Sequence, residues 1–260
     1  MRKLLAADFA QLLRDKVFWL AAVFMIASTV ILVVSTYNML TAFGVDPGQF
    51  PLESTMFCMM PGVGIVNAIW LHLLIGNDYD QGTIRNKLVC GHRRSSIFFS
   101  HWLVACCGAL FILAMSLMLG GALSWHYFHA FMLDAADFAL VLISCVLLTI
   151  AYAAIDVALA MNISRRASSV VCGIIVMLIL SMAPSVIDSM ITDITVYGHS
   201  VSPLTEKLLF FFYDLLPSAQ CVQINNMMFD RVSHWPLCSI LLTVVVTMIG
   251  YLIFKRKDIK

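Results

Sequence analysis

Charged side chains are scarce in this 260-residue chain: Asp, Glu, Lys and Arg together make up 12% of it, whereas hydrophobic residues make up 61%. An average soluble domain has about 25% charged residues. This shortage excludes one or two soluble domains. The 16 Lys and Arg and 15 Asp and Glu nearly cancel, to a formal net charge of +1, which does not indicate a nucleic-acid partner. The composition therefore places the chain in a lipid bilayer.

Signatures of common active sites are also missing. The sequence has no His-Glu-x-x-His, no Gly-x-Ser-x-Gly and no pair of carboxylates inside an apolar run, so no catalytic residue is predicted. It has no Gly-x-x-x-x-Gly-Lys-Ser/Thr loop, and an ATP-driven process would need a nucleotide-binding partner subunit. The eight cysteines lack zinc spacing, and His126 and His129 have no third ligand, so no metal site is predicted.

Six stretches are long and apolar enough to cross a hydrocarbon core of about 30 Å, which takes roughly 20 helical residues. They lie near residues 18–37, 56–75, 100–123, 138–160, 168–187 and 236–254. The two-residue alternation of membrane β-strands is absent, so the spans are helical. We predict an all-α polytopic membrane protein with six transmembrane helices in a single domain, residues 1–260.

The basic residues are distributed unevenly between the connections. Fourteen of the 16 Lys and Arg lie before the first span, in the second and fourth loops, or in the tail. The first and third loops have none, and the fifth loop, residues 188–235, has only Lys207 and Arg231. Short loops rich in Lys and Arg stay in the cytoplasm. Both termini are therefore predicted to be cytoplasmic.

Residues 1–17 have a helical apolar pattern, in which one face is apolar and the other polar. The apolar face is formed by Leu4, Leu5, Phe9, Leu12 and Leu13, and the polar face by Lys3, Asp8, Gln11, Arg14 and Asp15. This pattern predicts a helix lying in the cytoplasmic interface. The alternative is a frayed tail.

The second cytoplasmic loop, residues 76–99, has the most informative pattern. It contains an acidic turn at Asp78, a Gly82-Thr83 break, a short helix with basic residues and a second turn at Gly91. Glycine at position 82 would permit the turn, and Thr83 would cap the helix. Such a helix, rigidly joined to spans two and three, would transmit motion from a soluble partner. The alternative is an ordinary basic loop that anchors the two spans.

This loop resembles that of the ABC-2 type permeases, the membrane subunits of bacterial ABC exporters. Their loop often has Glu-Tyr, two residues, Gly-Thr-Ile/Leu-Arg/Lys, and then Gly/Pro and Arg before the third span. The matching positions are Asp78, Tyr79, Gly82, Thr83, Ile84, Arg85, Gly91 and Arg94, with Asp78 in place of the usual Glu. Leu216-Pro217 and Gln220 resemble the Leu-Pro-x-x-Gln stretch before the final span. The order of spans and loops is similar along the whole chain.

The resemblance implies an ABC-2, type V exporter-like permease in the bacterial cytoplasmic membrane. It would pair with a second permease, identical or similar, and with two copies of a separate ATPase subunit, which would bind the ATP and Mg²⁺. This chain would bind no cofactor, and its loop would supply the coupling helix. The implied coupling residues are Asp78, Tyr79, Gly82, Thr83, Arg85 and Arg94. Asp78 is expected to pair with Arg85 or with a partner's basic group. The implied substrate is a peptide or amphiphilic antibiotic, as in lantibiotic and bacitracin immunity exporters.

Three residues within the spans are candidates for a translocation path. Pro61 and Asn67, near Gly64, indicate a kink and close helix contact in span two. Asp156 stands out as an ionisable residue within span four, where a carboxylate is costly and often functional. For Pro61 and Asn67 the alternative is packing alone, and for Asp156 it is pairing with Arg165 or Arg166.

Two other function classes remain open from the sequence. An ion-coupled transporter or channel without an ATPase would depend on Asp156, and a membrane scaffold or sensor subunit would show no transport. The long fifth loop contains an apolar stretch, residues 208–217, that is too short to span. Short helices that re-enter the membrane or lie on its outer surface are expected there.

Overall fold

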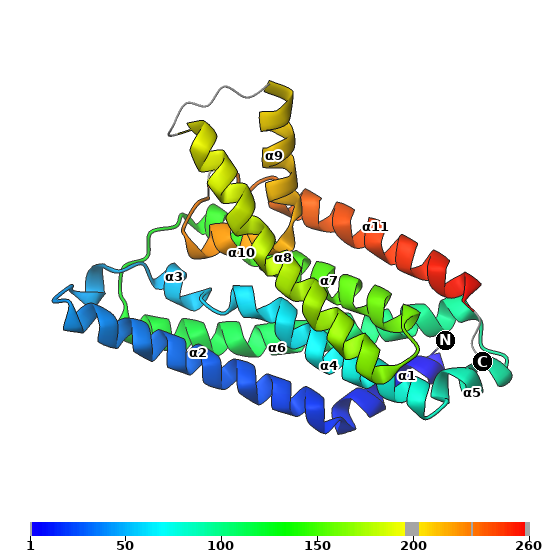
Figure 1. The fold of residues 1–260 in the computed structure, drawn as a ribbon. Helices are drawn as coiled ribbons and strands as arrows, with labels where there is room; N and C mark the ends of the chain where they lie inside the picture. Colours follow the sequence, from blue (N-terminus) through cyan, green and yellow to red (C-terminus); the bar gives the residue numbers. More distant parts are fainter. Residues whose placement is uncertain (1, 196–202, 230, 258–260) are drawn as a thin grey trace.

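The computed structural model describes residues 2–195, 203–229 and 231–257, and every regular element in these ranges is helical (Figure 1). Six helical segments are long and apolar enough to cross a membrane. They are Lys16–Ala42, Leu52–Asp80, Arg94–Tyr127, Ala135–Asn162, Arg166–Ile191 and Trp235–Arg256. The described chain is thus an all-α protein with the six long apolar helices expected from the sequence.

The long helices extend beyond the predicted spans because polar and charged residues continue each helix past its apolar run. They are α2 (Lys16–Ala42), α4 (Met60–Asp80), α6 (Arg94–Tyr127), α7 (Ala135–Asn162), α8 (Arg166–Thr195) and α11 (Trp235–Arg256). The shorter elements are α1 (Arg2–Arg14), the 3-10 turn η1 (Pro47–Gln49), α3 (Leu52–Met56), α5 (Thr83–Val89), α9 (Pro203–Leu215) and α10 (Pro217–Asn225).

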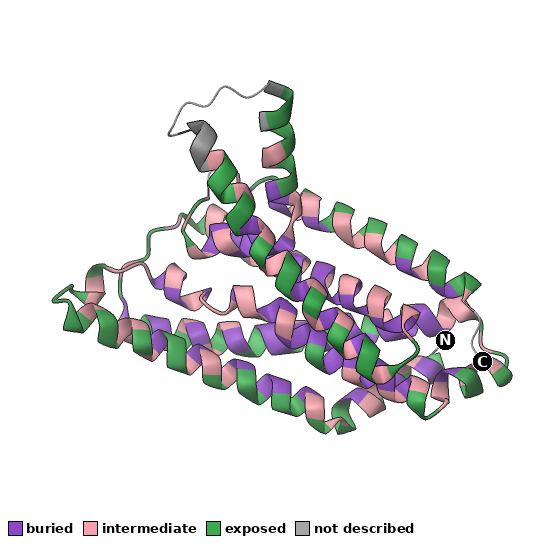
Figure 2. Cartoon of the chain, in the orientation of Figure 1, coloured by how far each residue is buried: buried purple, intermediate pink, exposed green. Residues whose placement is uncertain are grey.

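The buried residues concentrate on α4, α6 and α7, which form the centre of the bundle (Figure 2). In the most apolar stretch of the α3–α4 span, 61% of the residues are buried. In the most apolar stretches of α8 and α11, only 17% are buried. The exposed side chains of α2, α8 and α11 are largely apolar. Such surfaces are suited to lipid or to another membrane chain.

The second span is broken rather than bent. Helix α3 ends at Met56 and α4 begins at Met60, with Pro61 in its first turn, where a missing N–H costs no helical hydrogen bond. Close contact follows at Gly64, where an added Cβ would lie 2.8 Å from Cε1 of Tyr152 on α7. The predicted close helix approach is present, and a break between α3 and α4 stands in place of the predicted kink.

The N- and C-terminal ends of the chain lie at the same end of the bundle, beside α1 and α5 (Figure 1). We call this the basic end, since it also carries the basic residues that begin α2 and α6 and end α11. At the opposite end, α9 and the far part of α8 project beyond the other helices (Figure 1). Helix α10 lies at that end with most of its residues buried, and Cys221 Sγ lies 3.5 Å from the carbonyl oxygen of Met60.

Candidate functional site

The turn between α4 and α6 has the glycine geometry that the sequence predicted. Gly82 and Gly91 have φ values of 66° and 84°, in the left-handed region that favours glycine. Gly82 is also the N-cap of α5, and no side chain caps this helix, so the predicted capping role of Thr83 is wrong. Helix α4 continues to Asp80, which places Asp78 and Tyr79 in a helical turn rather than in the acidic turn expected.

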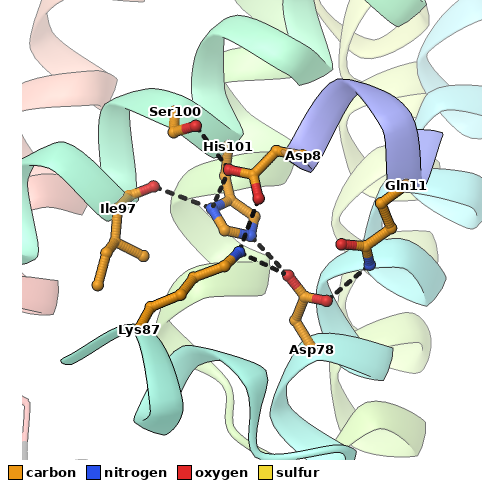
Figure 3. Close-up of polar contacts among 7 residues, drawn as sticks. All are labelled: Asp8, Gln11, Asp78, Lys87, Ile97, Ser100 and His101. Atoms are coloured by element: carbon orange, nitrogen blue, oxygen red, sulfur yellow. Dashed lines mark hydrogen bonds and ion pairs between the residues drawn. The ribbon is translucent and has the colours of Figure 1, made fainter. Parts of the chain in front are cut away.

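Asp78 is buried in a group of polar residues at the basic end (Figure 3). Its Oδ1 accepts a hydrogen bond from Gln11 Nε2 at 2.6 Å. Its Oδ2 lies 2.8 Å from His101 Nε2 and 3.4 Å from Lys87 Nζ. The prediction that Asp78 pairs with Arg85 is therefore wrong: Arg85 is exposed, and the cations beside Asp78 are Lys87 and His101.

Asp8 on α1 completes the group. Its Oδ1 accepts from Lys87 Nζ at 2.7 Å and its Oδ2 from Ser100 Oγ at 2.5 Å. Only 4% of Asp8 is exposed, so it faces the bundle and not the polar surface to which the amphipathic pattern assigned it. We call Asp8, Gln11, Asp78, Lys87, Ser100 and His101 the Asp78 cluster.

The hydrogen bonds of His101 define its charge. Its Nδ1 lies 2.9 Å from the carbonyl oxygen of Ile97, and its Nε2 lies 2.8 Å from Asp78 Oδ2. A carbonyl and an ionised carboxylate only accept hydrogen bonds, so both ring nitrogens must donate and the ring is an imidazolium. The Asp78 cluster then contains two carboxylates and two cations, and its formal charges cancel.

The Asp78 cluster fixes α5 to the bundle by one face. Ile84 of α5 is buried, and Lys87 reaches carboxylates on α1 and α4. The other face of α5 is open, with Arg85 and Asn86 exposed and Val89 80% exposed. An exposed valine among basic and polar side chains at a helix surface suits contact with another protein.

An open groove of about 680 Å³ runs along the inner side of this region, between α1 and the α4–α5 turn. It is lined by Ala7, Ala10, Gln11, Arg14, Asp15, Lys16, Asn77, Asp78, Gln81 and Thr83.

Tyr79 and Arg94 belong to a separate group of contacts at the end of α11. Tyr79 donates a hydrogen bond to the carbonyl oxygen of Met161, and Lys257 Nζ lies 3.0 Å from both the Tyr79 hydroxyl and that carbonyl. Arg94 donates to the carbonyls of Phe254, Lys255 and Lys257, as cations do at helix C-termini. Burial without a carboxylate partner lowers the pKa of Lys257 to about 8. Of the six predicted coupling residues, Asp78 lies in the Asp78 cluster and Tyr79 and Arg94 lie in this second group. The other three, Gly82, Thr83 and Arg85, lie in the turn and on α5, outside both groups.

Asp156 is fully buried on α7, and its closest ionisable neighbour is His72 of α4, whose Nε2 lies 3.6 Å from Asp156 Oδ1. The alternative that Asp156 pairs with Arg165 or Arg166 is therefore wrong. His72 Nδ1 also contacts Ser169 Oγ of α8 at 2.7 Å. Asn67, 1% exposed, accepts a hydrogen bond from Trp70 Nε1 at 3.1 Å within α4.

His72 and His101 were not predicted as site residues, although both are ionisable residues within long apolar runs, the same signal that points to Asp156. Asp8 was misassigned because an amphipathic pattern separates polar from apolar faces and does not show which polar residue finds a buried partner. Among the residues that the structure describes, no three His, Cys, Asp or Glu side chains are grouped closely enough to hold a metal ion.

Comparison with known proteins adds no assignment to this geometry. No known protein-family model matches the chain, and no curated protein matches it in sequence.

Proposed function

We propose that this chain is the membrane-spanning permease subunit of an ATP-binding cassette exporter, and that α5 is the helix that docks on a separate ATPase subunit. The observation that carries the proposal is the mounting of α5. Its inner face is tied to α1, α4 and α6 through the Asp78 cluster, and its outer face is open. A partner that moves α5 would thereby move the start of α6 and the end of α4.

The charge distribution supports the orientation that this function requires. Of the 16 Lys and Arg, thirteen lie in described segments at or near the basic end, which would lie in the cytoplasm of a bacterial cell under the positive-inside rule. Both termini, α1 and α5 would then face the ATPase subunits, which would bind ATP and Mg²⁺. The exposed apolar sides of α2, α8 and α11 would be covered by lipid and by a second permease chain.

For the substrate we propose a peptide or amphiphilic antibiotic. The sequence resemblance to immunity exporters supports this class. The opposite end of the bundle also carries acidic side chains, among them Asp46, Asp134 and Asp188, which would attract a cationic peptide.

The proposal is tested by purifying the tagged chain from its native membrane in mild detergent, identifying the co-purifying proteins by mass spectrometry and assaying ATP hydrolysis. We expect an ATPase subunit to co-purify with the wild-type chain. Val89→Asp should weaken this association more than about tenfold, because it places a charge in an apolar contact. Asp78 is unsuitable for this test because it is buried and its loss would disturb the bundle itself.

Lys255→Glu is the matched control, because Lys255 is exposed at the same end of the bundle but lies on α11. It should retain the ATPase, and both variants should unfold at the wild-type temperature. A wild-type chain that purifies without any ATPase, or a Val89→Asp chain that retains it fully, would contradict the proposal.

A second candidate function is ion-coupled transport without an ATPase, and the observation that favours it is the buried His72–Asp156 pair. In that case the purified chain alone, reconstituted in liposomes, would carry an ion flux that Asp156→Asn abolishes. The co-purification experiment separates the two candidates.

A further inference from the structure

The strongest unexplained feature of the molecule is an enclosed polar site between α4, α7 and α8. His72, Asp156 and Ser169 have no exposed surface. The position of the His72 ring depends on Gly173 of α8, where an added Cβ would lie 2.5 Å from His72 Nε2. The missing side chain at position 173 therefore makes room for an imidazole opposite a carboxyl group.

Asp156 is the residue in this site that lacks hydrogen-bond partners. Neither of its carboxyl oxygens has a hydrogen-bond partner, and His72 Nε2 also lacks one at the 3.6 Å separation. An ionised carboxylate without hydrogen bonds in an apolar interior is very costly, and a buried carboxyl group normally responds by taking up a proton. The geometry therefore disfavours a bare negative charge at this position.

The groups around Asp156 provide no positive charge that would balance an ionised carboxylate. Helix α4 contributes His72, α8 contributes Ser169, and Tyr152 lies one turn earlier on α7 itself, its hydroxyl 3.9 Å from Cys221 Sγ of α10. The nearest arginine along the α4–α8 contact is Arg166, which lies against Gly76, one turn of α4 beyond His72. In the ranges that the structure describes, no lysine or arginine forms an ion pair with Asp156, and neither α6 nor α11 supplies one.

We infer that His72 and Asp156 form a membrane-buried site that binds one proton, and that this proton resides on Asp156 while α4, α7 and α8 are in contact. With the proton the pair is neutral, and without it the pair carries one uncompensated negative charge. A hard metal cation fits less well, because such ions take about six oxygen ligands and the site offers only a carboxyl group and one hydroxyl.

The site links proton release to helix movement. A proton can leave Asp156 only when water reaches it, and that requires α8 to separate from α4 and α7. Helix α8 is the element best placed to do this, since only 17% of its most apolar stretch is buried. By linkage, a pH change would shift the equilibrium between the closed and the opened bundle. This inference is independent of the proposed function, because it concerns the chain alone and holds with or without an ATPase.

Infrared spectroscopy of the full chain in liposomes tests the inference directly. The difference between wild type and Asp156→Asn should contain the carbonyl band of a protonated carboxylic acid at about pH 6, and this band should disappear as the pH is raised to about 9. Asp134→Asn, which changes an exposed carboxyl group at the start of α7, is the control and should retain the band. His72→Gln should retain the band and shift its midpoint upward by at least about one pH unit, because the ionised carboxylate loses the imidazole ring, the nearest polar group that can stabilise its charge.

Dicyclohexylcarbodiimide, an apolar reagent for protonated carboxyl groups, gives a second measurement that needs no variant. The wild-type chain should acquire one adduct on the peptide that contains Asp156, in an amount that falls with rising pH and does not change with sodium concentration. Absence of both the band and the adduct throughout the pH range would overturn the inference. Loss of both on adding sodium at constant pH would instead assign a cation site, and an unchanged midpoint in His72→Gln would remove His72 from the site.

Discussion

The Asp78 cluster and the His72–Asp156 pair each contain a buried aspartate beside a histidine, yet they differ in how the charge of the aspartate is compensated. Asp78 receives hydrogen bonds from Gln11, Lys87 and His101, whereas the oxygens of Asp156 receive none. A fully bonded polar network makes neighbouring helices rigid, and a group without partners changes state instead. The number of donors around a buried carboxyl group, and not the residue type, thus separates a structural joint from a titrating site.

Position along α4 explains the difference. Asp78 lies in the last turn of α4, where α1, α5 and α6 all converge and each supplies a polar side chain. His72 lies nearly two turns deeper, where its neighbours belong to the apolar parts of α7 and α8. Polar residues from the end of the bundle can therefore supply hydrogen bonds to the Asp78 cluster, whereas the His72–Asp156 pair has no such residues beside it.

Breaking the Asp78 cluster should cause the largest loss of stability. Asp78→Ala would leave Lys87 and His101 with one carboxylate between them, and removal of one partner from a buried charge network costs about 3–5 kcal/mol. The thermal unfolding temperature of the purified chain should fall accordingly, as measured with a fluorogenic thiol reagent that detects the buried Cys106 and Cys145. Asp134→Ala, at an exposed carboxylate, is the control. An unfolding temperature equal to that of the control would show that the cluster does not join the helices.

The overall fold was largely predictable from the sequence because hydrophobic length is a strong signal for spanning helices. All six long apolar helices were predicted, and their ends were missed by a few residues because the helices continue into polar sequence. The glycine turns at Gly82 and Gly91 were also predictable, since only glycine readily adopts their conformation.

The candidate sites were less predictable because they depend on contacts between distant segments. The sequence identified Asp78 and Asp156 but not their partners, which are 23 residues away for His101 and much farther for Gln11 and His72. A span pattern gives the depth of a residue and not the direction in which it points. The expected contact between Asp78 and Arg85 therefore failed, while Lys87, in the same short helix, occupies that place.

Crowding the His72–Asp156 pair should lower the stability of the fold by an intermediate amount. Gly173→Ala would place a methyl group against the His72 ring, and overpacking of this kind costs about 1–3 kcal/mol. The ring would also move relative to Asp156, so the pH at which the carboxylic band disappears should change together with the unfolding temperature. Gly62→Ala is the matched control, because nothing lies within 4 Å of the added Cβ there. If both substitutions left the unfolding temperature and the midpoint pH of the carboxylic band unchanged, the close packing of Gly173 against His72 would not contribute to stability.

The smallest expected effect on stability comes from Lys257, whose partners differ from those of Lys87. Lys87 contacts two carboxylates, whereas Lys257 contacts only a hydroxyl, a carbonyl and the face of the Tyr79 ring, 4.2 Å from its centroid. Burial lowers the pKa of Lys257 from 10.5 to about 8, so the unfolded chain binds more protons than the folded one between these two values. The free energy of unfolding should therefore rise with pH across this window, and the rise should be absent in Lys257→Met.

Amine labelling at pH 8 measures the same property without unfolding. About half of the Lys257 amines should be neutral and nucleophilic at that pH, against less than about one in a hundred for an ordinary lysine, so an acylating reagent should modify Lys257 early. Lys255, exposed two residues away, is the internal reference in the same peptide region. If Lys257 were labelled no faster than Lys255, its pKa would not be lowered. Water would then reach the amine, and the contacts with Tyr79 and Met161 would not keep it buried. Faster labelling would establish that a cation at this end of the bundle loses its proton readily when, unlike Lys87, it has no carboxylate to retain it.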